Sequence, residues 1–380
     1  MARPSSSFTL FFIILQLLWT CSLYANGCYT SIIGFGDSLF DTGNLKQLNP
    51  QLGFFYPPYG ETFFHKPTGR ASNGRLIIDF IAESLKLPFV PPFFDDNGSQ
   101  KMELGQGVNY AVIGATALDS SILEAIGVHN KLTNVSSRVQ LEWFKQSICA
   151  NVSDCSHLIG DSLILMGETG MNEYINALED GKSIDEVETY VPFVVEAIIS
   201  AVNELIELGA KTILVPGGLP MGCFPMILKL DYGYDKTKYD NITGCLFQFN
   251  KIAEYHNELL MKELNKIREL YPEANLLYAD IYNAAMQFYR SPKKYGFTNE
   301  VSKACYDFTW VLRYNDSVSW WDLSPTLCDN PDTYISWDGT HLTEAAYKII
   351  SKSLLQGPYT VPQFYSSCLL KEMDVLSSFM

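Results

Sequence analysis

The stretch Ile32-Ile33-Gly34-Phe35-Gly36-Asp37-Ser38-Leu39-Phe40-Asp41-Thr42-Gly43-Asn44 begins as a short apolar run and ends in turn-forming residues. This pattern predicts a buried β-strand that enters a tight turn and presents Ser38 at its carboxyl end. In open parallel α/β sheets, ligands bind at that edge. A serine hydroxyl becomes a nucleophile when a base takes its proton, and the base usually needs an orienting acid.

One of the five histidines has an aspartate in a suggestive position, because Asp338 precedes His341 across a Gly-Thr turn. This spacing lets the carboxylate bind one ring nitrogen while the other faces outward. The acid would then fix the tautomer and stabilise the imidazolium that forms when Ser38 is deprotonated. The alternative is that Asp338 merely caps a helix that His341 opens.

Four further apolar runs predict strands, and the segments between them have helical periodicity. The predicted strands cover 107–116, 163–166, 212–216 and 275–280, and the predicted helices cover 76–85, 139–148, 184–208, 246–270 and 342–355. Strands that alternate with helices imply right-handed crossovers and a parallel sheet covered on both faces. No linker, repeat or low-complexity tract interrupts this pattern, so we expect a single domain.

Gly114 and Asn172 each follow a predicted strand, so they should lie at the same sheet edge as Ser38. Backbone N–H groups at such turns, together with a carboxamide, are suitable donors for a developing oxyanion. A second Gly-Asp-Ser-Leu occurs at 160–163, but its Ser162 precedes a strand. We therefore expect Ser162 at the opposite edge, in a structural role.

The amino terminus has the pattern of a secretory signal peptide, with Arg3, an apolar run over 8–19 and small residues near Ala25. This predicts a signal over 1–25 and a mature chain over 26–380. The alternative, a membrane anchor, needs ~20 apolar residues, so we expect no stable membrane insertion. The formal net charge is −15, and removal of Arg3 makes it −15 − 1 = −16. Such an acidic chain repels phosphate backbones, which argues against a nucleic-acid partner.

Eight cysteines remain after the signal, and an even number in a secreted chain suggests disulfides. Local pairing gives Cys149–Cys155, Cys223–Cys245 and Cys305–Cys328, although connectivity is not fixed by sequence. No metal-ligand spacing is present, so we expect no metal site. Five Asn-x-Ser/Thr sites fit a glycosylated surface; they are Asn97, Asn134, Asn151, Asn241 and Asn315.

Four blocks of the sequence, in order, resemble the plant GDSL esterase/lipase family, a branch of the SGNH hydrolases. They are 35–44 (FGDSLFDTGN), 107–117 (GVNYAVIGATA), 166–172 (MGETGMN) and 337–344 (WDGTHLTE). The resemblance covers nearly the whole mature chain and implies a flavodoxin-like three-layer α/β/α fold with a five-stranded parallel sheet.

The resemblance also implies roles for individual residues. Ser38 would be the nucleophile, His341 the base and Asp338 the orienting acid. The N–H groups of Ser38 and Gly114 and the side chain of Asn172 would form the oxyanion hole, and no cofactor is implied. The expected protein is a serine ester hydrolase, located outside the cell, in the apoplast, or in the vacuole.

The loop over 57–75 looks most like the subgroup that includes acetylajmalan esterase and sinapine esterase. We therefore expect a monomer that deacylates a small specialised metabolite, such as an alkaloid or a phenolic ester. The sequence departs from the family at Met171 and Glu173, where Gly and Asp are usual. Three alternatives remain: an acyltransferase with the same triad, a lipase for longer-chain esters, and a binding protein with a weakened site.

Overall fold

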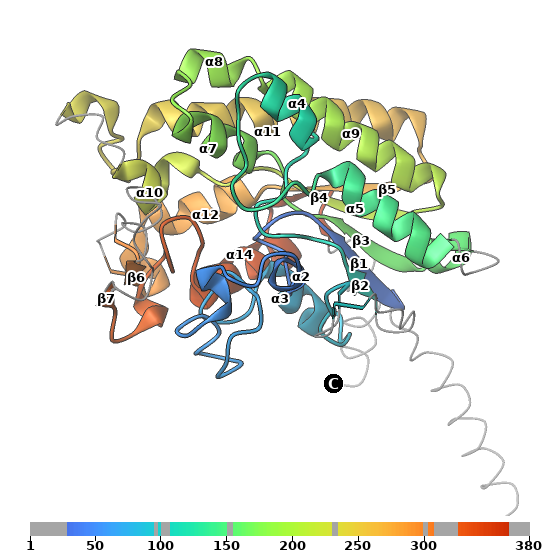
Figure 1. Cartoon of the computed structure of the whole chain (residues 1–380), viewed down its shortest axis with the longest axis horizontal. Coiled ribbons are helices and arrows are strands. Elements are labelled where there is room, and N and C mark those ends of the chain that lie inside the picture. The colour runs from blue at the N-terminus through green and yellow to red at the C-terminus, as the bar shows by residue number, and fades with distance from the viewer. Residues whose placement is uncertain are drawn as a thin grey trace, which may run out of the picture.

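A mainly parallel β-sheet lies at the centre of the molecule (Figure 1). The computed structural model describes residues 29–94, 98–99, 107–149, 155–229, 235–298, 303–307 and 326–364. Among these residues the sheet has the strand order β2-β1-β3-β4-β5-β8. Its strands are β1 Ser31–Phe35, β2 Val108–Asn109, β3 Ser162–Met166, β4 Thr212–Pro216, β5 Asn275–Ala279 and β8 Thr360–Val361.

Strands β1 to β5 are all parallel, which confirms the predicted α/β fold with a five-stranded parallel sheet. Their central residues are buried on both faces, and such strands appear in a sequence as continuous apolar runs. Strand β8 pairs antiparallel with β5 and was not predicted. It has only two residues and precedes Pro362, so it leaves no alternating pattern in the sequence.

Helices cover both faces of this sheet (Figure 1). One layer contains α5, α9 and α11, with α4, α6, α7, α8 and α10 around them, and the other contains α2, α3, α12 and α14. The first group is α4 Ser120–Ala125, α5 Ser137–Phe144, α6 Cys155–Gly160, α7 Met171–Glu179, α8 Ile184–Glu188, α9 Val191–Glu207, α10 Pro225–Leu228 and α11 Phe247–Leu270. The second is α2 Asn44–Leu48, α3 Ile77–Ser84, α12 Ile281–Arg290 and α14 Glu344–Gln356.

The predicted helix over 184–208 is two helices, α8 and α9, with a break at Thr189 and Tyr190. Pro192 stands in the first turn of α9, where its missing N–H is tolerated, but it could not continue a helix from α8. The segment Ile184–Glu207 is long and apolar enough to span a membrane by composition alone. In the fold, however, most apolar residues of α9 are buried or half-buried against the core and α9 packs on α11, whereas Phe193 is exposed.

Two further outcomes concern residues near the predicted site. Helix α14 begins at Glu344, and Thr343 caps it by accepting a hydrogen bond from the Ala346 N–H at 3.2 Å. The alternative that Asp338 caps this helix is therefore wrong. Ser162 lies at the amino edge of the sheet, opposite Ser38, as expected, although it is the first residue of β3 and does not precede the strand. Its hydroxyl contacts that of Ser31 at 2.8 Å and the Leu158 carbonyl at 2.7 Å.

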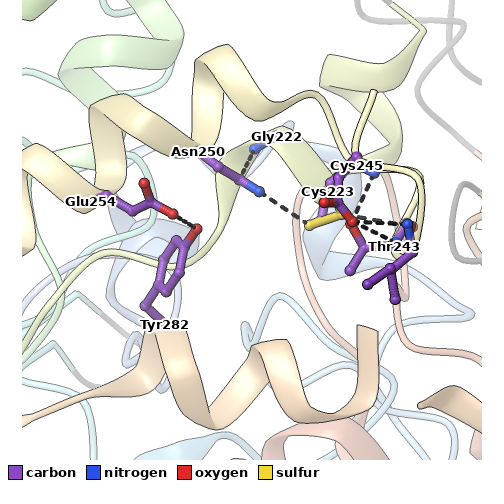
Figure 2. The surroundings of a disulfide bond; sticks show 9 residues. Gly222, Cys223, Thr243, Cys245, Asn250, Glu254 and Tyr282 are labelled. Carbon is purple, nitrogen blue, oxygen red and sulfur yellow. Dashed lines mark hydrogen bonds between the residues drawn. A yellow bond between two sulfur atoms is a disulfide. The ribbon is translucent and has the colours of Figure 1, made fainter. Parts of the chain in front are cut away.

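Two of the predicted disulfides, Cys223–Cys245 and Cys305–Cys328, are present in the described residues. The first joins the start of α11 to the loop before α10, and Asn250 accepts the Gly222 N–H beside it at 2.9 Å (Figure 2). The second lies next to a small sheet of β6 Tyr306–Asp307 and β7 Thr326–Leu327. The third predicted pair, Cys149–Cys155, is not formed, because Cys155 is a free, half-buried cysteine among the described residues.

Candidate active site

The turn after β1 places Ser38 at the carboxyl edge of the sheet. Gly36 has a φ of 130°, and a Cβ there would come within 3.0 Å of the Gly167 backbone, so glycine is required. Gln140 fixes this turn, because its amide accepts the Gly36 N–H and donates to the Gly36 carbonyl, both at 2.8 Å. Strand β1 lies between β2 and β3, where the strand order reverses, and such a switch point forms a natural crevice for ligands.

Asp338 and His341 form a tight pair. Asp338 Oδ1 accepts the N–H groups of Thr340 and His341 at 2.8 and 2.7 Å, and Oδ2 lies 2.7 Å from His341 Nδ1. The carboxylate therefore orients the ring and leaves Nε2 for another partner. Burial disfavours the charged form of both groups, but their mutual attraction and hydrogen bonding outweigh it. The pKa of Asp338 is therefore lower than its usual value, and the pKa of His341 is higher.

These residues share one cavity of about 180 Å³ with Ser38. Gly114 and Asn172 also line it, so the structure brings all five predicted site residues to a single pocket. Most of the remaining lining is apolar, and it consists of Leu39, Phe54, Ile113, Leu132, Met171, Ile175, Leu219, Phe224 and Met226. Further polar groups come from Asp37, Tyr59, Lys131, Glu168, Asn176, Glu179 and Thr340. The arrangement can hold a small, largely apolar molecule against a serine and an oriented imidazole.

Two backbone amides of this pocket are available as donors. Within the described ranges, no group accepts a hydrogen bond from the N–H of Ser38 or of Gly114. Gly114 has a φ of 80°, and a Cβ there would lie 2.9 Å from the Leu132 side chain, so this turn also needs glycine. Asp41 fixes the neighbouring residue by accepting the Ile113 N–H at 2.8 Å. The two amides can serve an anion at the serine.

Asn172 is more constrained than the sequence suggested. Its amide nitrogen donates to Asp37 Oδ2 at 3.0 Å and to the Ala115 carbonyl at 2.9 Å, which uses both amide hydrogens. To stabilise an oxyanion, Asn172 must release or share one of these acceptors. The two backbone amides are therefore the donors that need no rearrangement.

Three buried carboxyl groups lie beneath this edge, namely Asp37, Glu168 and Glu173. Burial raises the pKa of Asp37 to about 6, although hydrogen bonds from Glu168 and from the Leu39 N–H lower it. Burial and the Asp37 charge raise the pKa of Glu168 well above its usual value. Burial raises the pKa of Glu173 to about 7, although its Oε1 accepts the N–H groups of Ala117 and Leu118 at 2.6 and 2.9 Å. The longer side chain of Glu173 therefore caps a turn and does not itself enter the pocket.

Two residues outside the predicted triad and oxyanion hole also contact the site. The Tyr59 hydroxyl donates to Asp338 Oδ2 at 2.8 Å, and Phe54 meets the His341 ring edge-on at 5.6 Å between centroids. Both belong to the loop before residue 65, whose clustered prolines and aromatic residues are the signal in the sequence for a wall of the cleft near Ser38. Phe63 and Phe64, in contrast, pack on Phe89 and do not line the pocket.

The other predicted sites are less fully described. Asn134 and Asn241 are exposed, as glycosylation requires, whereas Asn97, Asn151 and Asn315 lie outside the described residues. Within the described ranges, no cluster of three or more His, Cys, Asp or Glu side chains could hold a metal ion.

Comparison with known proteins agrees with this geometry. The GDSL-like Lipase/Acylhydrolase family model matches residues 32–354. The chain is 48% identical over 359 residues to GDSL esterase/lipase At1g28570 of Arabidopsis thaliana, covering 91% of this chain and 90% of that protein. It is 47% identical over 370 residues to GDSL esterase/lipase At1g28590 of the same plant, covering 95% and 91%. The chain therefore belongs to the plant GDSL esterase/lipase family and is a carboxylic ester hydrolase.

Proposed function

We propose that this hydrolase acts through a Ser38–His341–Asp338 triad and an acyl-enzyme intermediate. The observation that carries the proposal is the 2.7 Å contact between Asp338 Oδ2 and His341 Nδ1 on the wall of the pocket that Ser38 lines. With Nδ1 protonated and bound to the carboxylate, Nε2 is the ring nitrogen that remains to take the serine proton.

The proposed reaction has two halves. Ser38 Oγ attacks the ester carbonyl while His341 takes its proton, and the N–H groups of Ser38 and Gly114, joined by Asn172, stabilise the oxyanion. His341 then protonates the departing alcohol. Water attacks the acyl-enzyme in the second half, with His341 again as the base, and releases the acid.

The proposed substrate is an ester of a small plant specialised metabolite, such as an acylated alkaloid or phenolic. A mostly apolar pocket of about 180 Å³ supports a compact substrate over a long lipid. The signal-like segment, the paired cysteines and the exposed Asn134 and Asn241 support a glycosylated protein in the apoplast or vacuole. The proposed protein is a monomer with one hydrolase domain over 26–380. An acyltransferase with the same triad would use an alcohol in place of water.

The test compares wild type with Ser38→Ala and His341→Gln on p-nitrophenyl acetate, together with labelling by a fluorophosphonate probe. We expect the wild type to turn over and to be labelled at Ser38, and both variants to lose at least about a thousandfold in kcat. Equal turnover by Ser38→Ala would refute the triad. Product analysis with an added alcohol separates hydrolysis from transfer, since a transferase would form a new ester.

A further inference from the structure

Met171 occupies a critical position in the pocket. It is the first residue of α7, directly before Asn172, and its side chain lines the cavity while only 3% of it is exposed. Its N–H donates to Glu168 Oε1 at 3.3 Å, which fixes the backbone at the start of the helix. The side chain is therefore held inside the pocket and is not free to swing into solvent.

The Met171 side chain packs against Gly218, which follows β4. A Cβ at Gly218 would lie 2.4 Å from Met171 Cε and 2.5 Å from its Sδ. The backbone of Gly218 is fixed by Asn257, which accepts its N–H at 2.7 Å and donates to its carbonyl at 3.1 Å. The φ of Gly218 lies outside the left-handed region, so glycine is needed here for space and not for backbone conformation.

The chemistry of ester cleavage indicates which part of a substrate meets Met171. The departing alcohol oxygen must lie against His341, because that residue protonates it. The carbonyl oxygen points to the N–H groups of Ser38 and Gly114. Met171 belongs to α7, on the Asn172 side of the pocket and on a different element from His341, so the group directed toward it is the acyl chain.

We propose that Met171, seated on Gly218, closes the acyl side of the pocket and restricts the enzyme to esters of short carboxylic acids. This inference rests on the proposed function, because it assumes attack by Ser38. A methionine thioether in that space excludes a chain of several carbons, and removal of the side chain opens the same volume to the substrate.

The test measures kcat/KM for p-nitrophenyl acetate, butyrate and octanoate with wild type, Met171→Gly and Gly218→Ala. We expect wild type to prefer acetate, and Met171→Gly to raise the octanoate-to-acetate ratio by at least about tenfold. Gly218→Ala should lower the butyrate-to-acetate ratio, because the new methyl group pushes the flexible thioether into the pocket. Both substitutions alter the contact between Met171 and Gly218, and we expect them to shift the preference for acyl length in opposite directions.

Met286→Ala is the matched control, since Met286 is a buried methionine of α12 outside the pocket lining and should leave the ratios unchanged. A second series varies the alcohol of acetate esters at a constant acyl group. Unchanged acyl ratios in both variants, or a change confined to the alcohol series, would overturn the inference. The proposed triad fails separately, through Ser38→Ala with acetate, so the two failures are distinguishable.

Discussion

Tyr59 extends the Asp338–His341 pair by a third hydrogen-bonding group. Its hydroxyl donates to Oδ2, the same carboxylate oxygen that contacts His341 Nδ1. The ring is 2% exposed and packs edge-on against Phe54, Tyr306 and Trp337. Tyr59 is therefore a positioning residue that acts through Asp338, and it also lowers the basicity of this carboxylate by hydrogen bonding.

Tyr59→Phe removes this donor, so Asp338 becomes more basic and attracts the imidazolium more strongly. The pKa of His341 should rise further, because its first opposing cause, burial, is unchanged. We expect the acid limb of the kcat/KM profile to move to higher pH by roughly one unit and kcat to fall about tenfold. Tyr110→Phe is the control, since Tyr110 is equally buried and bonds Ser147 at 2.7 Å away from the pocket. An identical profile in both variants would show that the Tyr59 hydroxyl has no role in positioning.

Glu168 and Asp37 share a second local interaction, directly below the nucleophile. Two buried carboxyl groups in contact cannot both ionise at low cost, so one proton is shared between them near neutral pH. Asp37 accepts from Asn172 and from the Leu39 N–H, at 3.0 and 2.9 Å, which favours Asp37 as the charged partner and Glu168 as the protonated one.

Glu168→Gln imitates the protonated partner, whereas Glu168→Ala leaves Asp37 without it. We expect Glu168→Gln to stay within about threefold of wild-type kcat and Glu168→Ala to lose about a hundredfold, because an unpaired buried carboxylate costs several kcal/mol. Activity of Glu168→Gln should also decline less than that of wild type toward pH 9, since it cannot lose the shared proton. Steady-state kinetics across pH 5–9 checks both points; equal losses in the two variants would contradict the shared proton.

At the level of elements, the first two sequence blocks support each other through side chains that bind backbone. Asn44 donates to the carbonyls of Asn109 and Ala111 at 2.7 and 2.8 Å, and Asn109 donates back to the Phe40 carbonyl at 2.7 Å. Asp41 accepts four backbone N–H groups, including that of Ile113. The turn that carries Ser38 and the turn that carries Gly114 are thus one hydrogen-bonded unit.

The two disulfides of the described residues each fix a segment that donates hydrogen bonds to the loop carrying His341. Cys223–Cys245 fixes the segment that leads to Phe224 and Met226 in the pocket wall, and the Met226 N–H donates to the Gly339 carbonyl at 2.9 Å. Cys305–Cys328 fixes the segment whose N–H groups at residues 305 and 306 donate to the carbonyls of Ser336 and Trp337 at 2.9 and 2.7 Å.

Because the two disulfides fix different parts of the site, we expect their removal to cause similar losses of stability but different kinetic effects. The separations of 22 and 23 residues give about 3 kcal/mol for each bridge from chain entropy. Replacing Cys223 and Cys245 by serine should mainly raise KM, because the pocket wall loosens. The same change at Cys305 and Cys328 should mainly lower kcat, because the Trp337–His341 loop shifts. Thermal melts and kinetics of each double variant provide the check, and the reverse assignment of KM and kcat effects would disprove it.

At the scale of the whole molecule, the sequence predicted the strands and helices that appear as local patterns, but not the contacts between loops that lie far apart in the chain. Strands β1 to β5 appear as apolar runs, and their carboxyl ends must share one edge, so Ser38, Gly114 and Asn172 could be placed together before any coordinates. Tyr59 and Asp338 are 279 residues apart, and loop packing alone brings them into contact. The two-residue β8 likewise depends on tertiary packing, whereas the break before α9 follows from Pro192, a local signal that the helical periodicity overrode in the prediction.

The pH dependence of folding also belongs to the whole molecule, because several buried groups set it together. Burial raises the pKa of Asp37 and Asp41 to about 6 and that of Glu173 to about 7, from unfolded values of 3.8 and 4.5. At pH values between the unfolded and the folded pKa, the folded state therefore retains protons that the unfolded chain has lost. Stability must rise as pH falls from about 7 to about 4, and it is lost as pH rises through the folded pKa values.

Two groups oppose this trend on the acid side. Burial lowers the pKa of His256 to about 4, so the folded state resists a proton that the unfolded chain takes up below 6.5. Asp338, whose pKa is lowered in spite of burial, loses its stabilising charge only below 3.8. Three carboxyl groups outweigh one histidine down to about pH 4, so we expect the melting temperature to be highest near pH 4 and to fall by several degrees toward pH 8. Glu173→Gln should flatten this slope, because a neutral amide has no proton to lose, while Glu258→Gln on the exposed side of α11 should leave it unchanged. Differential scanning calorimetry at pH 4.5 to 8 measures the slope directly, and a melting temperature that increases toward pH 8 would show that these carboxyl groups are ionised in the folded protein.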